Sequence, residues 1–295
     1  MGPIREATLL SMESGATLDA NALDKGDGGM VVLRTNTKEP ESYTSVQGNI
    51  NARGGPMGGN GGQVETSGTK LSIQNAQINT SAKNGLTGQW LLDPSDVVID
   101  DTIDDVFVLN NTLLSPASAA STTHITSTTL VNLLTQNDIT ISTTNDHTQG
   151  TGSGNITLAS ALALPVGSTL TLSASNQIFN SPSLITNLQN GSTLVLNAGA
   201  NSSWAGTITG SGNVQINMPG RSLTFKSDQL YTGSTTITAG TLALNGTNIG
   251  LSSGVINNAN FSIEALTNTA TIKSLSGNGL VSLGSKSLAL SIASG

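Results

Sequence analysis

The feature that most limits the fold of this 295-residue chain is its alternation of short apolar-patterned runs with clusters of glycine, asparagine and serine. Typical runs in the second half are NITL, STLTL, STLVL and NVQIN. Alternation with a period of two predicts β-strands that bury one face. Glycine and asparagine suit the breaks because they accept a positive φ at little cost. One helix-like pattern occurs, where Leu130, Leu133 and Leu134 would share a face and Ser127 or Thr128 would be the N-cap.

The first third of the chain contains an internal repeat. Residues 14–34 match residues 47–66 as a glycine, a short strand that ends in alanine, a glycine-rich turn, a glycine pair and a second strand. A looser third copy covers residues 76–93. Self-similarity at a fixed period, combined with strand content, predicts a solenoid.

The glycine pairs of the repeat, Gly28-Gly29 and Gly61-Gly62, predict unusual backbone geometry. At least one glycine of each pair is expected to have a positive φ or to lie too close to neighbouring backbone for a Cβ. The glycine-rich stretch 54–62 is predicted to be a turn and not a phosphate loop, because no Gly-Lys-Ser/Thr follows it.

The strand-like runs after Gly154 are separated neither by helical patterns nor by tight two-residue hairpins. Such runs suit a parallel β-helix, and an antiparallel sandwich is the competing interpretation. The predicted fold class is therefore all-β, a right-handed parallel β-helix (solenoid) with one short helix near 128–135. Three parts are expected: glycine-rich repeats in 1–92, an Asp-rich irregular segment with the short helix in 93–150, and regular rungs in 151–295.

Two motifs of the first half, GGNGGQVETSG and AKNGLTGQWLLDPSDVVI, resemble the filamentous-haemagglutinin family. The resemblance covers roughly residues 14–141 and implies a β-helical bacterial exoprotein of the two-partner secretion type. A second motif at 223–246, LTFKSDQLYTGSTTITAGTLALNG, is similar to the passenger-associated repeat of autotransporters. Its usual preceding Lys-Thr-Gly-Ala-Gly is replaced here by Asn-Met-Pro-Gly-Arg at 217–221. The route of secretion, two-partner or autotransporter, stays open between these resemblances.

Charge and composition exclude some function classes. The formal net charge is −7 and only 10% of residues are charged. An acidic chain without a basic stripe argues against nucleic-acid binding, which depends on neutralising phosphates. No apolar run approaches the ~18 residues of a transmembrane helix. The N-terminus has no apolar signal-peptide core, so any secretion signal is expected outside this sequence. The absence of cysteine fits export through the periplasm.

A cluster of six aspartates lies between Asp93 and Asp105 and is the candidate metal site. Hard oxygen ligands favour calcium, with Asp100, Asp101, Asp104 and Asp105 as the candidate ligands. The alternative is that these aspartates are turn residues on a solvated acidic edge. Their spacing matches no EF-hand loop. No cofactor and no other metal is predicted.

Residues for catalysis are scarce. His124 and His147 lie in Thr- and Asn-rich runs and are predicted to be loop residues, and Ser67 lacks the Gly-x-Ser-x-Gly context of a nucleophile. Glycosidases need paired carboxylates, yet residues 147–295 carry only Asp228 and Glu264 as acids. The chain is therefore predicted not to be an enzyme. A β-helical polysaccharide lyase or glycosidase is the alternative.

The predicted function is that of a secreted, surface-exposed bacterial adhesin, a rod that displays loops. The resemblance implies an extracellular location, glycans or proteins of host or bacterial surfaces as partners, and an outer-membrane transporter as the partner during export. Contacts are expected in Thr35–Ser45 and Asp100–Thr123, the longest stretches without a strand pattern. Loop residues can vary without disturbing a stack of strands, which makes them suitable contact residues.

Overall fold

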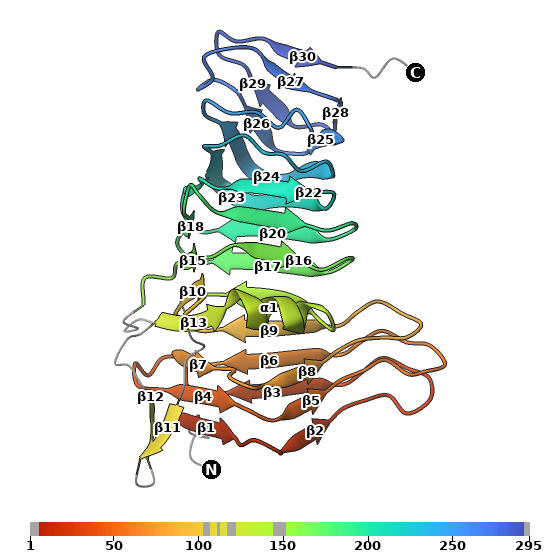
Figure 1. The fold of residues 1–295 in the computed structure, drawn as a ribbon, viewed down its shortest axis with the longest axis vertical. Coiled ribbons are helices and arrows are strands. Elements are labelled where there is room, and N and C mark those ends of the chain that lie inside the picture. The colour runs from red at the N-terminus through yellow and green to blue at the C-terminus, as the bar shows by residue number, and fades with distance from the viewer. Residues whose placement is uncertain (1–5, 103–106, 111–112, 117–121, 144–151, 292–295) are drawn as a thin grey trace. The chain divides into compact units, whose positions relative to one another are not determined.

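The computed structural model describes residues 6–102, 107–110, 113–116, 122–143 and 152–291 (Figure 1). The chain divides into two compact units, Met1–Asn155 and Ile156–Gly295, and each is considered by itself. The described residues are mostly strands, with a single helix, α1 (Ser127–Leu134). The predicted all-β class with one short helix near 128–135 is therefore confirmed.

In the first unit, each copy of the repeat contributes one strand to each of two parallel sheets, and the strand before each copy contributes to a third. The sheets are β1-β4-β7, β2-β5-β8 and β3-β6-β9, the last of which continues into β14. Met30 pairs with Gln63, and Gln63 pairs with Gln89, so equivalent residues of successive copies lie side by side. The strands are β1 (Leu9–Met12), β2 (Thr17–Asp19), β3 (Met30–Arg34), β4 (Tyr43–Val46), β5 (Asn49–Asn51), β6 (Gln63–Ser67), β7 (Lys70–Ser72), β8 (Gln77–Asn79), β9 (Gln89–Asp93) and β14 (Asp138–Ser142).

The Asp-rich segment is more regular than expected. Strand β10 (Asp96–Asp100) buries Val97 and Ile99 and pairs in parallel with β13 (Thr122–Thr126). Strands β11 (Phe107–Asn110) and β12 (Leu113–Pro116) form an antiparallel pair with two residues between them in sequence. The expectation that Asp100–Thr123 lacks strands is therefore wrong. The runs Phe107–Asn110 and Leu113–Pro116 do not alternate apolar with polar residues, so their sequence shows no strand pattern.

In the second unit, strands again pair in parallel with strands that follow later in the chain. The main sheet has the order β17-β20-β23-β24-β25-β28. Beside this order, β21 pairs with β23, and β26 pairs with β24 and β29. The smaller sheets are β15-β18, β16-β19-β22 and β27-β30. The strands are β15 (Ile156–Leu158), β16 (Leu162–Leu164), β17 (Thr169–Ala174), β18 (Ile178–Asn180), β19 (Ile185–Leu188), β20 (Thr193–Ala198), β21 (Ser202–Trp204), β22 (Thr207–Gly210), β23 (Asn213–Phe225), β24 (Ser234–Leu244), β25 (Gly254–Asn257), β26 (Asn260–Ser262), β27 (Ala270–Ile272), β28 (Leu275–Ser276), β29 (Leu280–Ser282) and β30 (Leu288–Leu290).

Columns of branched side chains form the core of this sheet. Leu172 pairs with Leu196, Leu196 with Ile216, and Ile216 with Ile237, and all four are fully buried. Each such side chain contributes about 1.5–3 kcal/mol through burial. The alternation read from the sequence thus becomes a continuous apolar column, because the parallel register brings inward positions together.

The segment Thr35–Ser45 was predicted to be a surface loop, and most of it is not. Thr35 and Thr44 are fully buried, their hydroxyls lie 3.1 Å apart, and Thr44 Oγ1 donates to the Ser67 carbonyl at 2.7 Å. Residues 43–46 form β4, and the exposed part is limited to Lys38, Glu39 and Glu41. Polar composition did not mark exposure here because the hydroxyls are hydrogen-bonded inside the stack.

Helix α1 begins at Ser127, whereas Ser127 or Thr128 was predicted to be the N-cap that precedes the helix. The N-cap is Thr126, whose Oγ1 accepts a hydrogen bond from the Thr129 N–H at 3.1 Å. The predicted buried face of Leu130, Leu133 and Leu134 is confirmed. No helix within the described ranges is long and apolar enough to cross a membrane.

Candidate functional site

Three glycine-rich loops leave the same side of the first unit, after β2, β5 and β8 (Figure 1). They comprise residues 20–29, 52–62 and 80–88 and are called the stacked loops. Each belongs to one copy of the repeat, so each lies one layer from the next.

Backbone hydrogen bonds between layers hold the stacked loops together. Ala22 N donates to the Arg53 carbonyl, and Gly54 N donates to the Ser81 carbonyl, both at 3.0 Å. Near the tips, Asn60 links all three loops: its N–H donates to Asp27 Oδ1 at 2.7 Å, and its Oδ1 accepts from Leu86 N at 2.9 Å. The ladder pattern of the sheets therefore continues into the loops, which orders side chains that would otherwise project freely.

The paired glycines permit this close stacking. A Cβ on Gly61 would collide with the Thr80 carbonyl oxygen, and one on Gly62 with the Gly29 carbonyl oxygen. A Cβ on Gly28 would collide with the Ala52 carbonyl oxygen. None of these glycines has a positive φ. The prediction for the pairs is confirmed through close backbone approach.

A groove of about 490 Å³ crosses the base of the stacked loops and is called the loop groove. It is lined by one small group of residues from each layer: Asn21, Ala22 and Leu23; Arg53, Gly54 and Pro56; Ser81, Ala82 and Lys83. Two of the lining residues, Arg53 and Lys83, are cations, and none is acidic. This positive lining stands out in a chain whose net charge is −7.

The Arg53 side chain is oriented by its neighbour in the preceding layer. Asn21 Oδ1 accepts hydrogen bonds from the Arg53 backbone N–H at 2.8 Å and from its Nε at 3.3 Å. A guanidinium can still donate two parallel hydrogen bonds from its terminal nitrogens to a carboxylate or sulfate. Leu23, 90% exposed, adds apolar surface beside the two cations. The groove can therefore hold an anionic group attached to a partly apolar ring or chain.

Of the four predicted calcium ligands, two lie within the described residues and both have protein partners. Asp100 Oδ2 lies 2.8 Å from His124 Nδ1, and Asp100 Oδ1 accepts from Thr102 N at 3.1 Å and Oγ1 at 2.8 Å. Asp101 Oδ1 accepts from Ser127 Oγ at 2.6 Å. Asp104 and Asp105 lie outside the described residues, so calcium binding by this segment stays a prediction.

The Asp100–His124 pair links β10 to β13. Burial raises the pKa of Asp100, but the hydrogen bonds from His124 and Thr102 outweigh burial and leave the pKa below its usual value. The prediction that His124 is a loop residue is wrong, because it lies in β13; His147 is not among the described residues. Within the described ranges, no three His, Cys, Asp or Glu side chains come together as a metal site.

Ser67 is a buried residue of β6 whose hydroxyl donates to Glu65 Oε1 at 2.7 Å, a structural contact.

The sequence reasoning missed Arg53 and Lys83 because it treated the glycine-rich stretches only as turns. A signal was present: Arg53 comes two residues and Lys83 four residues after a short strand, in consecutive copies of the repeat.

No protein-family model matches the chain, and no curated protein matches it significantly.

Proposed function

We propose that this chain is part of a secreted bacterial surface adhesin of the filamentous-haemagglutinin type. In this proposal both units are right-handed parallel β-helices. Three features support the fold: strands pair with strands one layer later, buried side chains align in columns, and parallel strands joined by crossovers are nearly always right-handed. The family motifs within 14–141 support the extracellular location and the need for an outer-membrane transporter during export.

The loop groove is the observation that carries the adhesive role. It gathers Arg53 and Lys83 on loops that stand away from the sheets, and these loops are ordered by hydrogen bonds between layers. Its partner is an anionic group on the surface of a host cell or another bacterium, carried by a glycan or a protein. The role is binding and not catalysis. Single contacts of this kind are weak, and many copies on one cell surface add avidity.

The test is attachment of beads coated with the 295-residue chain to epithelial cells and to bacterial cells. Arg53→Gln with Lys83→Gln removes both charges and leaves a polar side chain at each position. Attachment is expected to fall several-fold, and the parent's attachment is expected to weaken as salt rises, because exposed charges are screened.

The matched control is Lys226→Gln with Lys286→Gln, which removes the same charge from an exposed and a half-buried position of the second unit. It should attach like the parent. Equal loss in both double variants would mean that net charge and not the loop groove determines attachment. A parent that attaches to neither cell type would contradict the adhesive role itself.

A further inference from the structure

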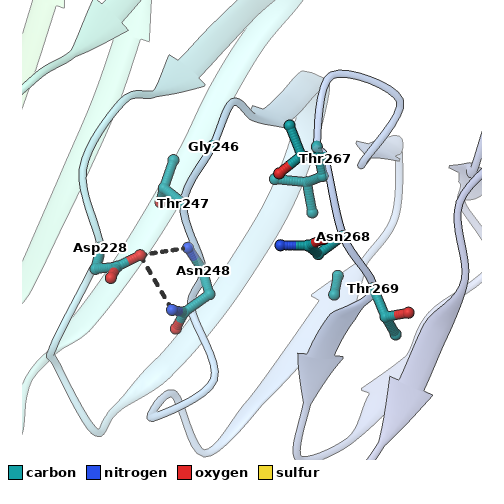
Figure 2. A pocket seen from close by; sticks show the side chains of 9 residues that line it. Asp228, Gly246, Thr247, Asn248, Thr267, Asn268 and Thr269 are labelled. Carbon is teal, nitrogen blue, oxygen red and sulfur yellow. Dashed lines mark hydrogen bonds between the residues drawn. The ribbon is translucent and has the colours of Figure 1, made fainter.

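The second unit contains a polar cleft between two of its layers (Figure 2). Its volume is about 260 Å³. One wall is Asp228 and residues 246–248, and the other is residues 266–270. The cleft contains no residue of the loop groove, and the inference drawn from it does not depend on the proposed function.

The cleft opens where a ladder of side chains is interrupted. Asp228, Asn248 and Asn268 occupy corresponding turns of three successive layers. Between the first two layers the ladder is closed, since Asp228 Oδ1 accepts from Asn248 N at 2.9 Å and from Asn248 Nδ2 at 3.0 Å. Between the second and third layers the cleft takes the place of such contacts, and Asn268 points across it toward Asn248 (Figure 2).

The first wall is held rigidly. Asn248 Oδ1 accepts from the Gly250 N–H at 3.1 Å, so both ends of its amide are engaged. Thr247 Oγ1 donates to the Ser227 carbonyl at 2.6 Å. Asp228 is exposed and lines the cleft beside Asn248.

The second wall supplies exposed hydrogen-bonding groups on an anchored loop. Leu266 and Ala270 are buried, and the backbone N–H groups of these two residues donate to Ile263 and Ser287. Between them, Thr267, Asn268 and Thr269 are all exposed. Asn268, flanked by two threonines, therefore points its amide across the gap toward the wall that carries Asp228 and Asn248 (Figure 2).

The chemistry of the two walls points to a neutral, hydroxyl-rich ligand. No lysine or arginine lines the cleft, so it offers nothing to neutralise an anion. Its single carboxylate is too few for a hard cation, which takes six or more oxygen ligands. A sugar ring presents adjacent hydroxyls, each a donor and an acceptor, which a carboxylate and an amide can bind in pairs. The volume lies just below the roughly 300–1,000 Å³ of drug-sized ligand pockets, which suits a ligand as small as one ring.

We propose that this cleft binds a single neutral sugar unit, with Asp228 accepting and Asn268 both donating and accepting hydrogen bonds from its hydroxyls. The probes are methyl glucoside, methyl galactoside, methyl mannoside and N-acetylglucosamine. Saturation-transfer NMR on the 295-residue chain detects dissociation constants in the range of about 1 mM, which a few exposed hydrogen bonds can provide. At least one of these sugars is expected to receive saturation from the parent.

The site is then tested by substitution. Asn268→Ala and Asp228→Asn are each expected to weaken binding about fivefold or more, the effect of losing one hydrogen bond. Asp228→Asn keeps an oxygen for Asn248, so the first wall should stay intact. Asn190→Ala removes an exposed amide elsewhere in the same unit and should bind like the parent. If Asn268→Ala perturbs folding, as thermal melts would reveal, Thr267→Ala with Thr269→Ala replaces it.

Three outcomes overturn the proposal. In the first, none of the four sugars receives saturation from the parent. In the second, a sugar binds the Asp228 and Asn268 variants as well as it binds the parent. In the third, a neutral peptide, acetyl-diglycine amide, displaces the bound sugar from the parent and loses its own binding in the same variants. The last outcome would mean that the cleft binds peptide backbone and not a sugar. Failure of bead attachment in the loop-groove variants has no bearing on these measurements, because neither Arg53 nor Lys83 lines this cleft.

Discussion

Asn137 accepts a hydrogen bond from the backbone N–H of Thr80 at 3.0 Å, although 57 residues separate them in sequence. Its Oδ1 also accepts from Thr80 Oγ1 at 2.9 Å, and its Nδ2 donates to the carbonyls of Ile78 at 2.9 Å and Leu133 at 2.8 Å. Asn137 is 1% exposed. The Asn137 amide thus makes hydrogen bonds to the edge of β8, at the place where a further strand of that sheet would pair. The same amide also connects β8 to the C-terminal end of α1.

Asn137→Ala is therefore expected to destabilise the first unit by about 2–3 kcal/mol, because several buried backbone groups lose their partner together. Asn137→Asp should cost at least as much, because it removes the donor and buries a charge. Urea unfolding followed by circular dichroism measures both. Asn132→Ala, an exposed position on the same helix, is the control and should change stability little. An Asn137→Ala variant as stable as this control would mean that the edge of β8 does not depend on the amide.

Gly62 gives a prediction about the stacked loops. A Cβ there would meet the Gly29 carbonyl oxygen, whereas a Cβ on Gly29 would meet Ala20 Cβ at 3.1 Å, a milder contact. Gly62→Val is expected to cost more than about 1 kcal/mol, because backbone in a neighbouring layer must move. Gly62→Ala should also cost more than Gly29→Ala. Denaturant melts of the three variants test this, and equal costs for the two alanine variants would show that the layers are not in close contact.

The pattern of strands could be read from the sequence because inward and outward positions alternate in every layer. Leu172 and Leu196 mark their column by alternation alone. Thr35 and Thr44 carry no such signal, because a threonine that satisfies its hydroxyl inside the stack looks like a surface threonine in the sequence. The loop groove could not be found by periodicity, since Arg53 and Lys83 come together only when the glycines allow their loops to stack.

The polar clefts and pairs escaped the sequence analysis for a related reason. Asp100 was read with its neighbours in sequence, as one of a cluster of carboxylates, whereas its partner His124 lies on a paired strand. In a fold of layered strands, side chains meet across layers, so local sequence says little about polar partners.

Tyr231 provides a test of the second unit at high pH. The residue is fully buried, and its hydroxyl lies 2.6 Å from Thr235 Oγ1, which in turn lies 3.0 Å from Ser252 Oγ. Burial raises the pKa of Tyr231 above its usual value of 10.0, and the hydrogen bond to Thr235 only partly offsets this. The unfolded chain therefore ionises first. The stability that Tyr231 contributes is fully present below pH ~10 and is lost as pH rises above it.

Tyr231→Phe is expected to cost about 1 kcal/mol near pH 7, because Thr235 loses a partner. The difference between parent and variant should shrink as pH rises above about 10, since only the parent gains ionisation of this phenol on unfolding. Both proteins keep Tyr43, so its titration cancels from the comparison. A difference that is constant between pH 7 and about 11 would mean that the phenol is not buried in this way.

The Asp100–His124 pair predicts the response of the first unit to acid. The pKa of Asp100 lies below its usual value of 3.8, because hydrogen bonds from His124 and Thr102 outweigh burial. The sign follows from linkage: a lowered pKa in the folded state gives stability that is present above pH ~4 and is lost as pH falls through the lowered pKa. Asp100→Asn should therefore cost about 1–2 kcal/mol at neutral pH, and less with increasing acidity below pH ~4.

A double-variant cycle separates the pair from other effects of the substitutions. Asp100→Asn and His124→Gln are expected to be non-additive, with the double variant less destabilised than the sum of the two single costs, because each single change removes the same contact. The matched control is Glu264→Gln, which replaces an exposed acid of the second unit. Its effect on the free energy of unfolding should not change comparably as pH falls. Urea unfolding between pH 3 and 7 provides the data. Additive costs, or a cost of Asp100→Asn that persists unchanged at pH ~3, would contradict the assignment of this hydrogen-bonded pair as the link between β10 and β13.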